Sequence, residues 1–497
     1  MTRIRPQRGQ NQQVTVGPAD PAVTGVAGIE AVRQLNRVLG LAGTLDAAIG
    51  PIKQRDRGLT GGQFLVSLAS AQLTGGKHLV SLDRRRTDQA GQLLEAAPTP
   101  ASTTARKLAQ RFGPAQVSAI ETAVGQVNAA VVQQADPIRR SALLTEVTID
   151  GDATDIEVYG PAKDGAVHNY KGERAYRGHI GYWAELGVPV AADLLGGNDD
   201  PRSYVRELLR RAVGNLPAGV EKIRSRWDGG YFARELAEEC TGLHVGFAIG
   251  AKRNKPMISA ANAVPEQAWV SAVGMEHTEI AVIGYLPGAW PAVNKAGDPV
   301  VCIARRTRIP VEHISADPRS RKRRTIPKDQ LALALDGKID AVYGYSFFLT
   351  DQLTGRDADQ LTTPDPGTGP DITSCEALAM LEWWYRHRTD IEALNRDARH
   401  GADLFHLPSA DRVINTVWMW GALLACAMSA WLQEVTRIDA GNGRGRRVIA
   451  TLRHELICVP ARVISHAGRL ILRPAPGARY RLLTTVLARL RVLPSPA

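Results

Sequence analysis

Between Leu143 and Cys240, short β-type runs alternate with helical segments, and this alternation limits the possible folds of the chain more than any other feature. The runs L-L-T-E-V-T-I-D, D-I-E-V-Y-G and G-V-P-V-A-A-D-L-L-G-G have the composition of strands. After them, Tyr204–Val213 has helical spacing, Val220–Asp228 is strand-like and Ala233–Cys240 is helical again. Because strands that alternate with helices pack as an α/β layer, we expect an α/β core.

The pattern differs on both sides of this core. With 497 residues, of which 44% are hydrophobic, the chain is long enough for roughly three domains. Apolar residues recur at helical spacing before the core, whereas β-rich fragments separated by Pro and Gly follow it. The expected segments are a disordered N-terminus (1–25), a helical domain (26–140), the first part of the core (141–253), a mainly β insertion (254–370), the last part of the core (371–440) and an Arg-rich helical C-terminal region (441–497).

The positive charge of the chain is concentrated at its C-terminal end. The formal net charge is +11, and Asn442–Ala497 contains eleven Arg, one acidic residue and no Lys. A local arginine excess is what a polyanion-binding surface requires. A second basic cluster is a solvated loop or a set of phosphate contacts. The candidate DNA-binding residues are Arg444, Arg446 and Arg447 in the tail and Arg319, Arg321, Lys322, Arg323 and Arg324 in the insertion.

Two features bear on the compartment. Val413–Gln433 has 21 residues without a charge, which is long enough for a membrane span, but its Asn, Thr and Ser residues favour a fully buried helix of a large core. The five cysteines are dispersed and form no C-x-x-C pair, and the polar, basic start has no apolar block behind it. We expect a cytoplasmic protein; the alternative is a protein that is anchored in a membrane by Val413–Gln433.

Three carboxylates stand out by position. Asp150 follows the apolar end of a strand and begins D-G-D-A-T-D, Asp228 follows another strand, and Glu392 lies in a segment without Gly or Pro. Ligands bind at strand ends of open α/β sheets, although a single strand-end Asp is more often a turn or cap residue. Within the first block Asp150 is the preferred metal ligand and Asp152 its rival. Three carboxylates without a Cys or His cluster favour Mg²⁺ or Mn²⁺ over zinc.

The third segment predicts a polar strip on one helix. At about 100° per residue, Tyr385, Arg388, Glu392 and Arg399 fall within a strip about 60° wide. A solvated strip of ion pairs is the simple explanation. The alternative is a site for a metal-bound phosphate, in which Glu392 ligates the metal and the arginines hold phosphate oxygens.

These blocks resemble a known family. Y-R-H-R-T-D-I-E-A-L-N-R-D-A-R (Tyr385–Arg399) resembles the Y-x2-R-x3-E-x6-K signature of bacterial insertion-sequence transposases, which carry an Asp-Asp-Glu triad on a ribonuclease-H-like core; Arg399 replaces the customary Lys. D-G-D-A-T-D-I-E-V-Y-G and R-S-R-W-D-G-G-Y-F are similar to the regions of the first and second Asp. The resemblance implies catalytic, metal-binding roles for Asp150, Asp228 and Glu392, with Asp152, Tyr385, Arg388 and Arg399 in support.

The same resemblance implies an activity and partners. The expected reaction is cut-and-paste DNA transposition, in which two Mg²⁺ or Mn²⁺ ions assist cleavage at transposon ends and transfer of the 3′-hydroxyl into target DNA. The expected partners are double-stranded DNA, as inverted-repeat ends and target, and a second copy of the chain. Residues 26–140 would then bind DNA or dimerise, and the protein would act at a bacterial nucleoid. The alternatives are an inactive transposase-derived DNA-binding protein and a metal-dependent, structure-selective nuclease.

Overall fold

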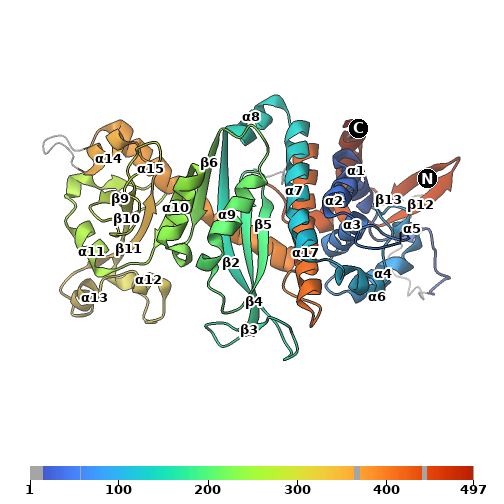
Figure 1. Cartoon of the computed structure of the whole chain (residues 1–497), viewed down its shortest axis with the longest axis horizontal. Helices are drawn as coiled ribbons and strands as arrows, with labels where there is room; N and C mark the ends of the chain where they lie inside the picture. The colour runs from blue at the N-terminus through green and yellow to red at the C-terminus, as the bar shows by residue number, and fades with distance from the viewer. Residues whose placement is uncertain (1–14, 56, 363–369, 439–444, 496–497) are drawn as a thin grey trace, which may run out of the picture.

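The computed structural model describes residues 15–55, 57–362, 370–438 and 445–495, without the side chain of Arg321. The molecule is elongated, with the N-terminal helices at one end, the segment 254–370 at the other and the strands β2, β4, β5 and β6 between them (Figure 1). The first and last described elements, the strand Val23–Thr24 (β1) and the helix Ala478–Val492 (α19), lie beside the N-terminal helices. The strands β2, which carries Asp150 and Asp152, and β6, which precedes Asp228, lie in the middle of the molecule (Figure 1).

Helices occupy the chain from Ile29 to Thr145. They are α1 (Ile29–Leu39), α2 (Leu41–Ile49), α3 (Gly61–Leu73), α4 (Val80–Thr87), α5 (Gln89–Gln92), α6 (Ser102–Ala109), α7 (Pro114–Gln134) and α8 (Pro137–Thr145). Helix α3 begins with a capping box between Thr60 and Gln63, which satisfies backbone N–H groups that have no partner inside the helix. The apolar residues of α1 and α3 are buried in the main core.

The long apolar segment forms helix α17 (Arg412–Thr436), which joins the N-terminal helices to the sheet. It packs against α3, α7 and β5 (Val188–Gly196), and Trp418, Trp420 and Trp431 are buried in it. Trp431 Nε1 donates a hydrogen bond of 2.8 Å to Asn128 Oδ1 on α7. By length and composition α17 could cross a membrane, but 89% of its most apolar window is buried inside the protein. The expectation of a buried core helix is confirmed.

Within the described ranges the main sheet has ten strands, in the order β3-β4-β2-β6-β7-β11-β10-β9-β8, with β5 paired to β4. Strands β2, β6 and β7 run parallel, whereas β4 is antiparallel to both β2 and β5. The strands of its first half are β2 (Glu146–Glu157), β3 (Val167–His168), β4 (Arg174–Trp183), β5, β6 (Lys222–Trp227) and β7 (Val245–Ala251). Helices α9 (Val205–Gly214) and α10 (Arg234–Leu243) connect β5 to β6 and β6 to β7. This half is the α/β layer that the alternation predicts.

The segment 254–370 extends this sheet. Strand β11 (Ala341–Thr350) pairs antiparallel with β7, and β10 (Val301–Pro310), β9 (Thr278–Ile283) and β8 (Val270–Ser271) follow it. The segment is less purely β than its strand-like fragments indicate. It also contains the helices α11 (Lys255–Asn262), α12 (Arg321–Arg324), α13 (Lys328–Leu335) and α14 (Gly355–Thr362).

The expectation of helices throughout the C-terminal region is wrong for Ala461–Pro474. Strands β12 (Ala461–His466) and β13 (Arg469–Pro474) form a hairpin, and β1 (Val23–Thr24) pairs with β12. Ala467 and Gly468 form its turn with φ values of 49° and 73°, the left-handed backbone that a tight hairpin requires. Among residues 445–495, the described part of this region, helical structure is limited to α18 (Ile449–Leu452), the π turn after it and α19 (Ala478–Val492).

Candidate active site

Asp152 and Asp228 come from adjacent parallel strands and line the same cleft. Gly151 is the last residue of β2 that pairs with β6, where it is in register with Trp227, so Asp152 and Asp228 follow at the point where this parallel pairing ends. Strand β2 itself continues to Glu157, paired with β4, so Asp150 and Asp152 lie inside the strand and not after its end as expected. The cleft has a volume of about 470 Å³ and contains both carboxylates. Burial raises the pKa of Asp152, and the negative charge of Asp228 raises it further. Two carboxylates are therefore held close enough to repel each other.

Asp150, the preferred first metal ligand, lies two residues before Asp152 on β2 but does not line the cleft. Its side chain is fully buried, and both of its oxygens accept hydrogen bonds from Arg226, from Nε at 2.6 Å and Nη2 at 2.7 Å. Burial raises the pKa of Asp150 to about 6, against the effect of Arg226, so the carboxylate is still ionised at neutral pH. Arg226 Nη1 also donates to the Trp384 carbonyl at 2.5 Å. The structure thus ties Asp150 to the core and leaves Asp152 in the cleft.

Gly151 explains the sequence between the two aspartates. Side chains alternate along a strand, so Asp150 and Asp152 share one face of β2 and Gly151 belongs to the other. On that other face the Trp227 ring covers Gly151, and a Cβ atom there would lie 1.8 Å from the ring. The D-G-D pattern is therefore required by a buried tryptophan as well as by the cleft.

The expected regular helix around Glu392 is interrupted twice. Helix α15 (Ile372–Arg386) is followed by a 3₁₀ turn (His387–Thr389), then by α16 (Asp390–Arg396) and a π turn (Asp397–Gly401). Changes of helix type alter the angle per residue, so the angles of one regular helix do not apply from Tyr385 to Arg399. Glu392 is exposed, and it does not line the cleft.

Tyr385 and Arg388 both lie near the aspartates. Tyr385 donates a hydrogen bond of 3.3 Å to the Trp227 carbonyl, just before Asp228, and stacks on Phe348 with ring centroids 4.3 Å apart. Burial raises the pKa of its hydroxyl to about 12, so it remains a neutral donor. The positive charge of Arg388 opposes the rise in the pKa values of both Asp150 and Asp152. These two residues therefore secure the backbone of the site and add a cation near it.

Asn395 was not found by sequence reasoning, yet it contacts the site directly. Its Nδ2 donates a hydrogen bond of 2.6 Å to Asp152 Oδ2, and its side chain is buried. Asn395 follows Glu392 by three residues, so it lies one turn along α16 and about 60° around it. Nothing in the composition of the segment distinguishes this amide from other polar residues of the helix.

Arg399 lines the cleft as a cation. Its guanidinium lies over the Phe405 ring, 5.3 Å from the centroid, and its Nε is buried without a hydrogen-bond partner. An unsatisfied buried N–H is costly, and an anion in the cleft would satisfy it. The residue is therefore suited to hold a phosphate oxygen.

The aspartate pair fits a divalent cation. Hard divalent ions prefer carboxylate oxygens, and a cation between Asp152 and Asp228 would relieve their repulsion. In the part of the chain that the structure describes, however, no group of three or more His, Cys, Asp or Glu side chains is arranged to hold a metal ion. The expected set of Asp150, Asp228 and Glu392 is not brought together here, because Asp150 is bound by Arg226 and Glu392 is exposed.

Comparison with known proteins identifies the family. The family model described as "Transposase DDE domain group 1" matches residues 7–297, more than half of the chain. The chain belongs to this family. It is a DNA transposase of the DDE type. No curated protein matches its sequence. Among solved structures it is similar to a piggyBac transposase in a synaptic complex with hairpin DNA, with 9% identity, a TM-score of 0.34, and coverage of 86% of this chain and 79% of that one.

The arginines expected to bind DNA in the C-terminal region of the transposase are engaged within the protein. Arg446 is ion-paired with Glu434 and hydrogen-bonded to the Leu186 carbonyl. Arg447 Nε donates to Glu455 Oε2 at 2.6 Å. Arg444 lies outside the described residues. Arg446 therefore holds the C-terminal region against the core, whereas Arg447 pairs within that region.

The basic cluster of the insertion lies largely at the surface of the transposase. Arg319, Lys322 and Arg324 are exposed, whereas Arg323 Nη1 donates to the Ser315 carbonyl at 2.8 Å. The Arg321 side chain is outside the described part. The exposed members, unlike Arg446 and Arg447, are accessible to the phosphates of a bound nucleic acid.

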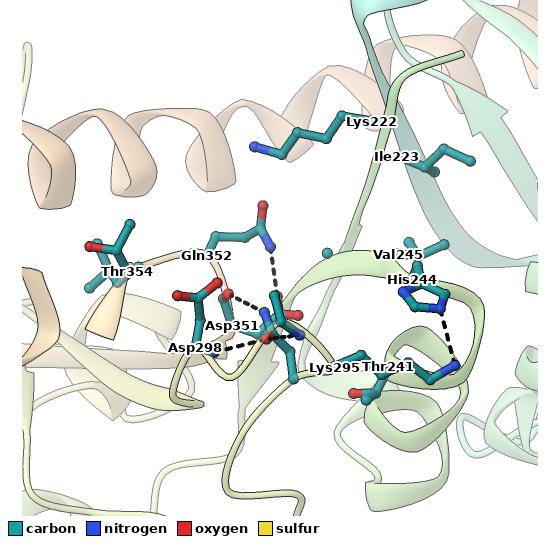
Figure 2. Close-up of a pocket in the computed structure, with 14 residues that line it drawn as sticks. Lys222, Ile223, Thr241, His244, Val245, Lys295, Asp298, Asp351, Gln352 and Thr354 are labelled. Carbon is teal, nitrogen blue, oxygen red and sulfur yellow. Dashed lines mark hydrogen bonds between the residues drawn. The ribbon is translucent and has the colours of Figure 1, made fainter. Parts of the chain in front are cut away.

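A second pocket of the transposase, about 290 Å³ in volume, lies at the opposite ends of the strands (Figure 2). Lys222 and Ile223 at the start of β6 and Val245 at the start of β7 line it, whereas Asp228 follows the end of β6. Lys295 Nζ is 3.2 Å from His244 Nε2 in this pocket (Figure 2). This pocket is therefore distinct from the carboxylate cleft.

Proposed function

We propose that this transposase performs cut-and-paste transposition, cleaving DNA at transposon ends and joining the freed 3′-hydroxyl to target DNA. The observation that carries the proposal is that Asp152 and Asp228 line one open cleft, where the parallel pairing of β2 with β6 ends. The strand arrangement β5-β4-β2-β6-β7 supports a ribonuclease-H-like core, in which the first two acidic residues belong to the strands β2 and β6. Asp152 is thus proposed as the first catalytic aspartate in place of Asp150.

The roles of the side chains follow from their contacts. Asp152 and Asp228 would hold Mg²⁺ or Mn²⁺, which when bound assists attack on a phosphodiester and stabilises the leaving oxygen. Asn395 fixes one oxygen of Asp152 and thereby orients the other. Arg399 offers an unsatisfied N–H to a non-bridging phosphate oxygen. Tyr385 holds the backbone that carries Asp228.

Glu392 is the third acidic residue that the family resemblance implies. It lies one turn before Asn395 on α16, and an exchange of their places requires a rotation of about 60° with a shift of one turn. The 3₁₀ and π turns at the two ends of α16 are irregular segments of the kind found at functional hinges. We propose that α16 moves in this way when DNA and metal bind, so that Glu392 joins the aspartate pair.

The proposed partners are double-stranded DNA, as ends and target, and a second copy of the chain, because two ends must be held together. The exposed cations of the insertion segment (Arg319, Lys322 and Arg324) supply one surface for DNA phosphates. We propose that the protein acts in the cytoplasm, on the DNA of a nucleoid.

A nicking and joining assay tests this function. The full chain is incubated with supercoiled plasmid carrying the DNA that flanks its coding region, in Mg²⁺ or Mn²⁺ and in EDTA. Nicking with metal, absence of nicking in EDTA, and joined products from a pre-cut end are expected. Asp152→Asn and Asp228→Asn should abolish nicking, whereas Glu157→Gln, an acidic residue of the same cleft, should retain it.

The outcomes separate the alternatives. DNA binding without nicking would point to an inactive transposase-derived DNA-binding protein. Nicking without joined products would point to a structure-selective nuclease. Unchanged nicking by Asp152→Asn would remove the assignment of Asp152, and unchanged nicking by Glu392→Gln would show that the two aspartates act without the third acidic residue.

A further inference from the structure

Tyr231 is a buried residue of the carboxylate cleft that the proposed function does not use. It belongs to the D-G-G-Y-F block, in which the 3₁₀ turn Gly229–Tyr231 follows Asp228 directly. Its backbone N–H donates to the Asp228 carbonyl at 3.0 Å, and Asp228 Oδ1 accepts the N–H of Gly230 at 2.8 Å. Tyr231 lines the cleft together with Asp152 and Asp228, although it is only 1% exposed. The turn that carries Tyr231 therefore also fixes the second aspartate.

The ring of Tyr231 packs against two other buried rings. It stacks on His179 of β4, with ring centroids 5.7 Å apart and an angle of 18° between the planes. Its second neighbour is Trp227, the last residue of β6, with centroids 5.0 Å apart and an angle of 60°. Both neighbours are fully buried. Because interiors are close-packed, a ring held in this way keeps one orientation, so the fold fixes the position of the Tyr231 hydroxyl.

The hydroxyl of Tyr231 is buried and has no hydrogen-bond partner among the residues that the structure describes. Burial raises the pKa of Tyr231, and the negative charges of Asp152 and Asp228 raise it further, so a neutral donor lies near both carboxylates. A buried donor without an acceptor is destabilising, and most native proteins contain few of them. The penalty disappears in any state of the protein that brings an acceptor to the hydroxyl.

Asp152 has an oxygen that can be this acceptor. Asn395 Nδ2 and Thr154 Oγ1 both donate to its Oδ2, at 2.6 Å and 3.2 Å, and no side chain in the described ranges donates to its Oδ1. Asp152 and Asp228 repel each other in the free protein, whereas a divalent cation between them would attract both. Carboxylates that ligate a metal are in turn hydrogen-bonded by neighbouring groups that fix their orientation. A donor beside the aspartate pair is therefore in the place where such support is needed.

We propose that Tyr231 is a positioning residue: in the metal-loaded protein its hydroxyl donates to Asp152 Oδ1, and His179 and Trp227 hold its ring for this contact. The inference rests on the proposed function, because it requires Asp152 and Asp228 to hold the metal. It gives a role to the tyrosine of the D-G-G-Y-F block. Because the hydroxyl has no acceptor in the metal-free protein, its removal should weaken metal binding without lowering stability.

Binding of Mn²⁺ to the full chain tests the proposal in the absence of DNA. The Kd is measured from the electron paramagnetic resonance signal of free Mn²⁺, and Asp152→Asn shows which part of the binding belongs to the aspartate pair. Tyr231→Phe keeps the ring and removes only the hydroxyl. Loss of a group that supports a metal ligand typically weakens metal binding by about 10- to 100-fold, and we expect an increase in Kd of this size.

Tyr182→Phe is the matched control. Tyr182 lies on β4 and is 1% exposed, and its hydroxyl is likewise buried without a hydrogen-bond partner in the described part of the chain, but it does not line the cleft. Because each variant removes a buried donor that lacks an acceptor, both should unfold in urea at a midpoint equal to or above that of the wild type. Only Tyr231→Phe should lose affinity for Mn²⁺.

The proposal is overturned if Tyr231→Phe binds Mn²⁺ as tightly as Tyr182→Phe does. A urea midpoint of Tyr231→Phe below that of the wild type would also overturn it, because the hydroxyl would then already have a partner in the metal-free protein. Plasmid nicking by the wild type is measured in parallel. Nicking together with an unchanged Kd in Tyr231→Phe refutes only this inference, whereas Tyr231-dependent Mn²⁺ binding without nicking refutes only the proposed function.

Discussion

Replacing Asp150 and Asp152 separately distinguishes a structural from a catalytic aspartate two residues apart. Asp150→Ala leaves Arg226, which is 4% exposed, without the carboxylate that holds its Nε and Nη2. Breaking a buried ion pair by removing one partner costs about 3–5 kcal/mol, because the remaining charge stays buried. Asp152→Ala removes a carboxylate whose pKa is raised by burial and by Asp228. Relief of that repulsion offsets the lost hydrogen bond, so the free energy of unfolding should change by less than about 1 kcal/mol.

Urea unfolding and plasmid nicking together measure the contrast. Unfolding is followed by tryptophan fluorescence, since Trp227 and Trp384 lie beside the ion pair. Asp150→Ala should unfold at much lower urea, and Asp152→Ala should unfold near the wild-type midpoint but fail to nick DNA in Mg²⁺. The reasoning is refuted if Asp150→Ala keeps wild-type stability, or if Asp152→Ala is the variant that loses about 3 kcal/mol or more.

Three further predictions concern Gly151 beside the site and, away from it, Glu121 on α7 and Arg446 of the C-terminal region. Gly151→Ala places a Cβ atom 1.8 Å from the Trp227 ring and should lower the urea midpoint strongly; an unchanged midpoint would contradict this packing. Burial raises the pKa of Glu121 from 4.5 to about 7, so its stabilising effect is complete below pH 4.5 and is lost as the pH rises through 7. Glu121→Gln should remove on the order of 3 kcal/mol of this pH dependence, as measured by urea unfolding from pH 4.5 to 8, and a persisting slope would refute the assignment. Arg446→Ala breaks the ion pair with Glu434 and should lower stability while the salt dependence of DNA binding stays the same; a smaller salt slope would restore Arg446 as a phosphate contact.

The spacing of apolar residues predicted the structure correctly where a segment forms a single type of element. The alternation of strand and helix between Leu143 and Cys240 predicted the α/β layer, and the uncharged run after Val413 predicted a buried helix. The prediction was wrong where the helical spacing of one stretch was assumed to continue through its neighbours. In the C-terminal region, Ala461–His466 and Arg469–Pro474 alternate as strands around an Ala-Gly turn, although the residues around them have helical spacing.

For single residues of the site as well, some positions could be predicted from the sequence and others could not. The sequence placed Asp228 directly after a strand, as the structure has it, but Asp150 and Asp152 lie inside β2 and not after its end. The D-G-D spacing puts both of them on the same face of that strand. It could not choose between them, because the choice depends on Arg226, a residue 76 positions away that neutralises Asp150. The exposure of Glu392 depends in the same way on two breaks in a segment that has no Gly or Pro to reveal them.

The amino-acid sequence by itself determined the family of this protein and the strand–helix alternation of its α/β layer, because these depend on residue type and short-range spacing. Only the tertiary structure decided which aspartate faces the cleft, that Asn395 holds it, and that Arg446 and Arg447 pair with carboxylates inside the protein. A carboxylate or guanidinium becomes a ligand, a DNA contact or a buried ion-pair partner according to the charge that packing places next to it, and that partner is distant in the sequence.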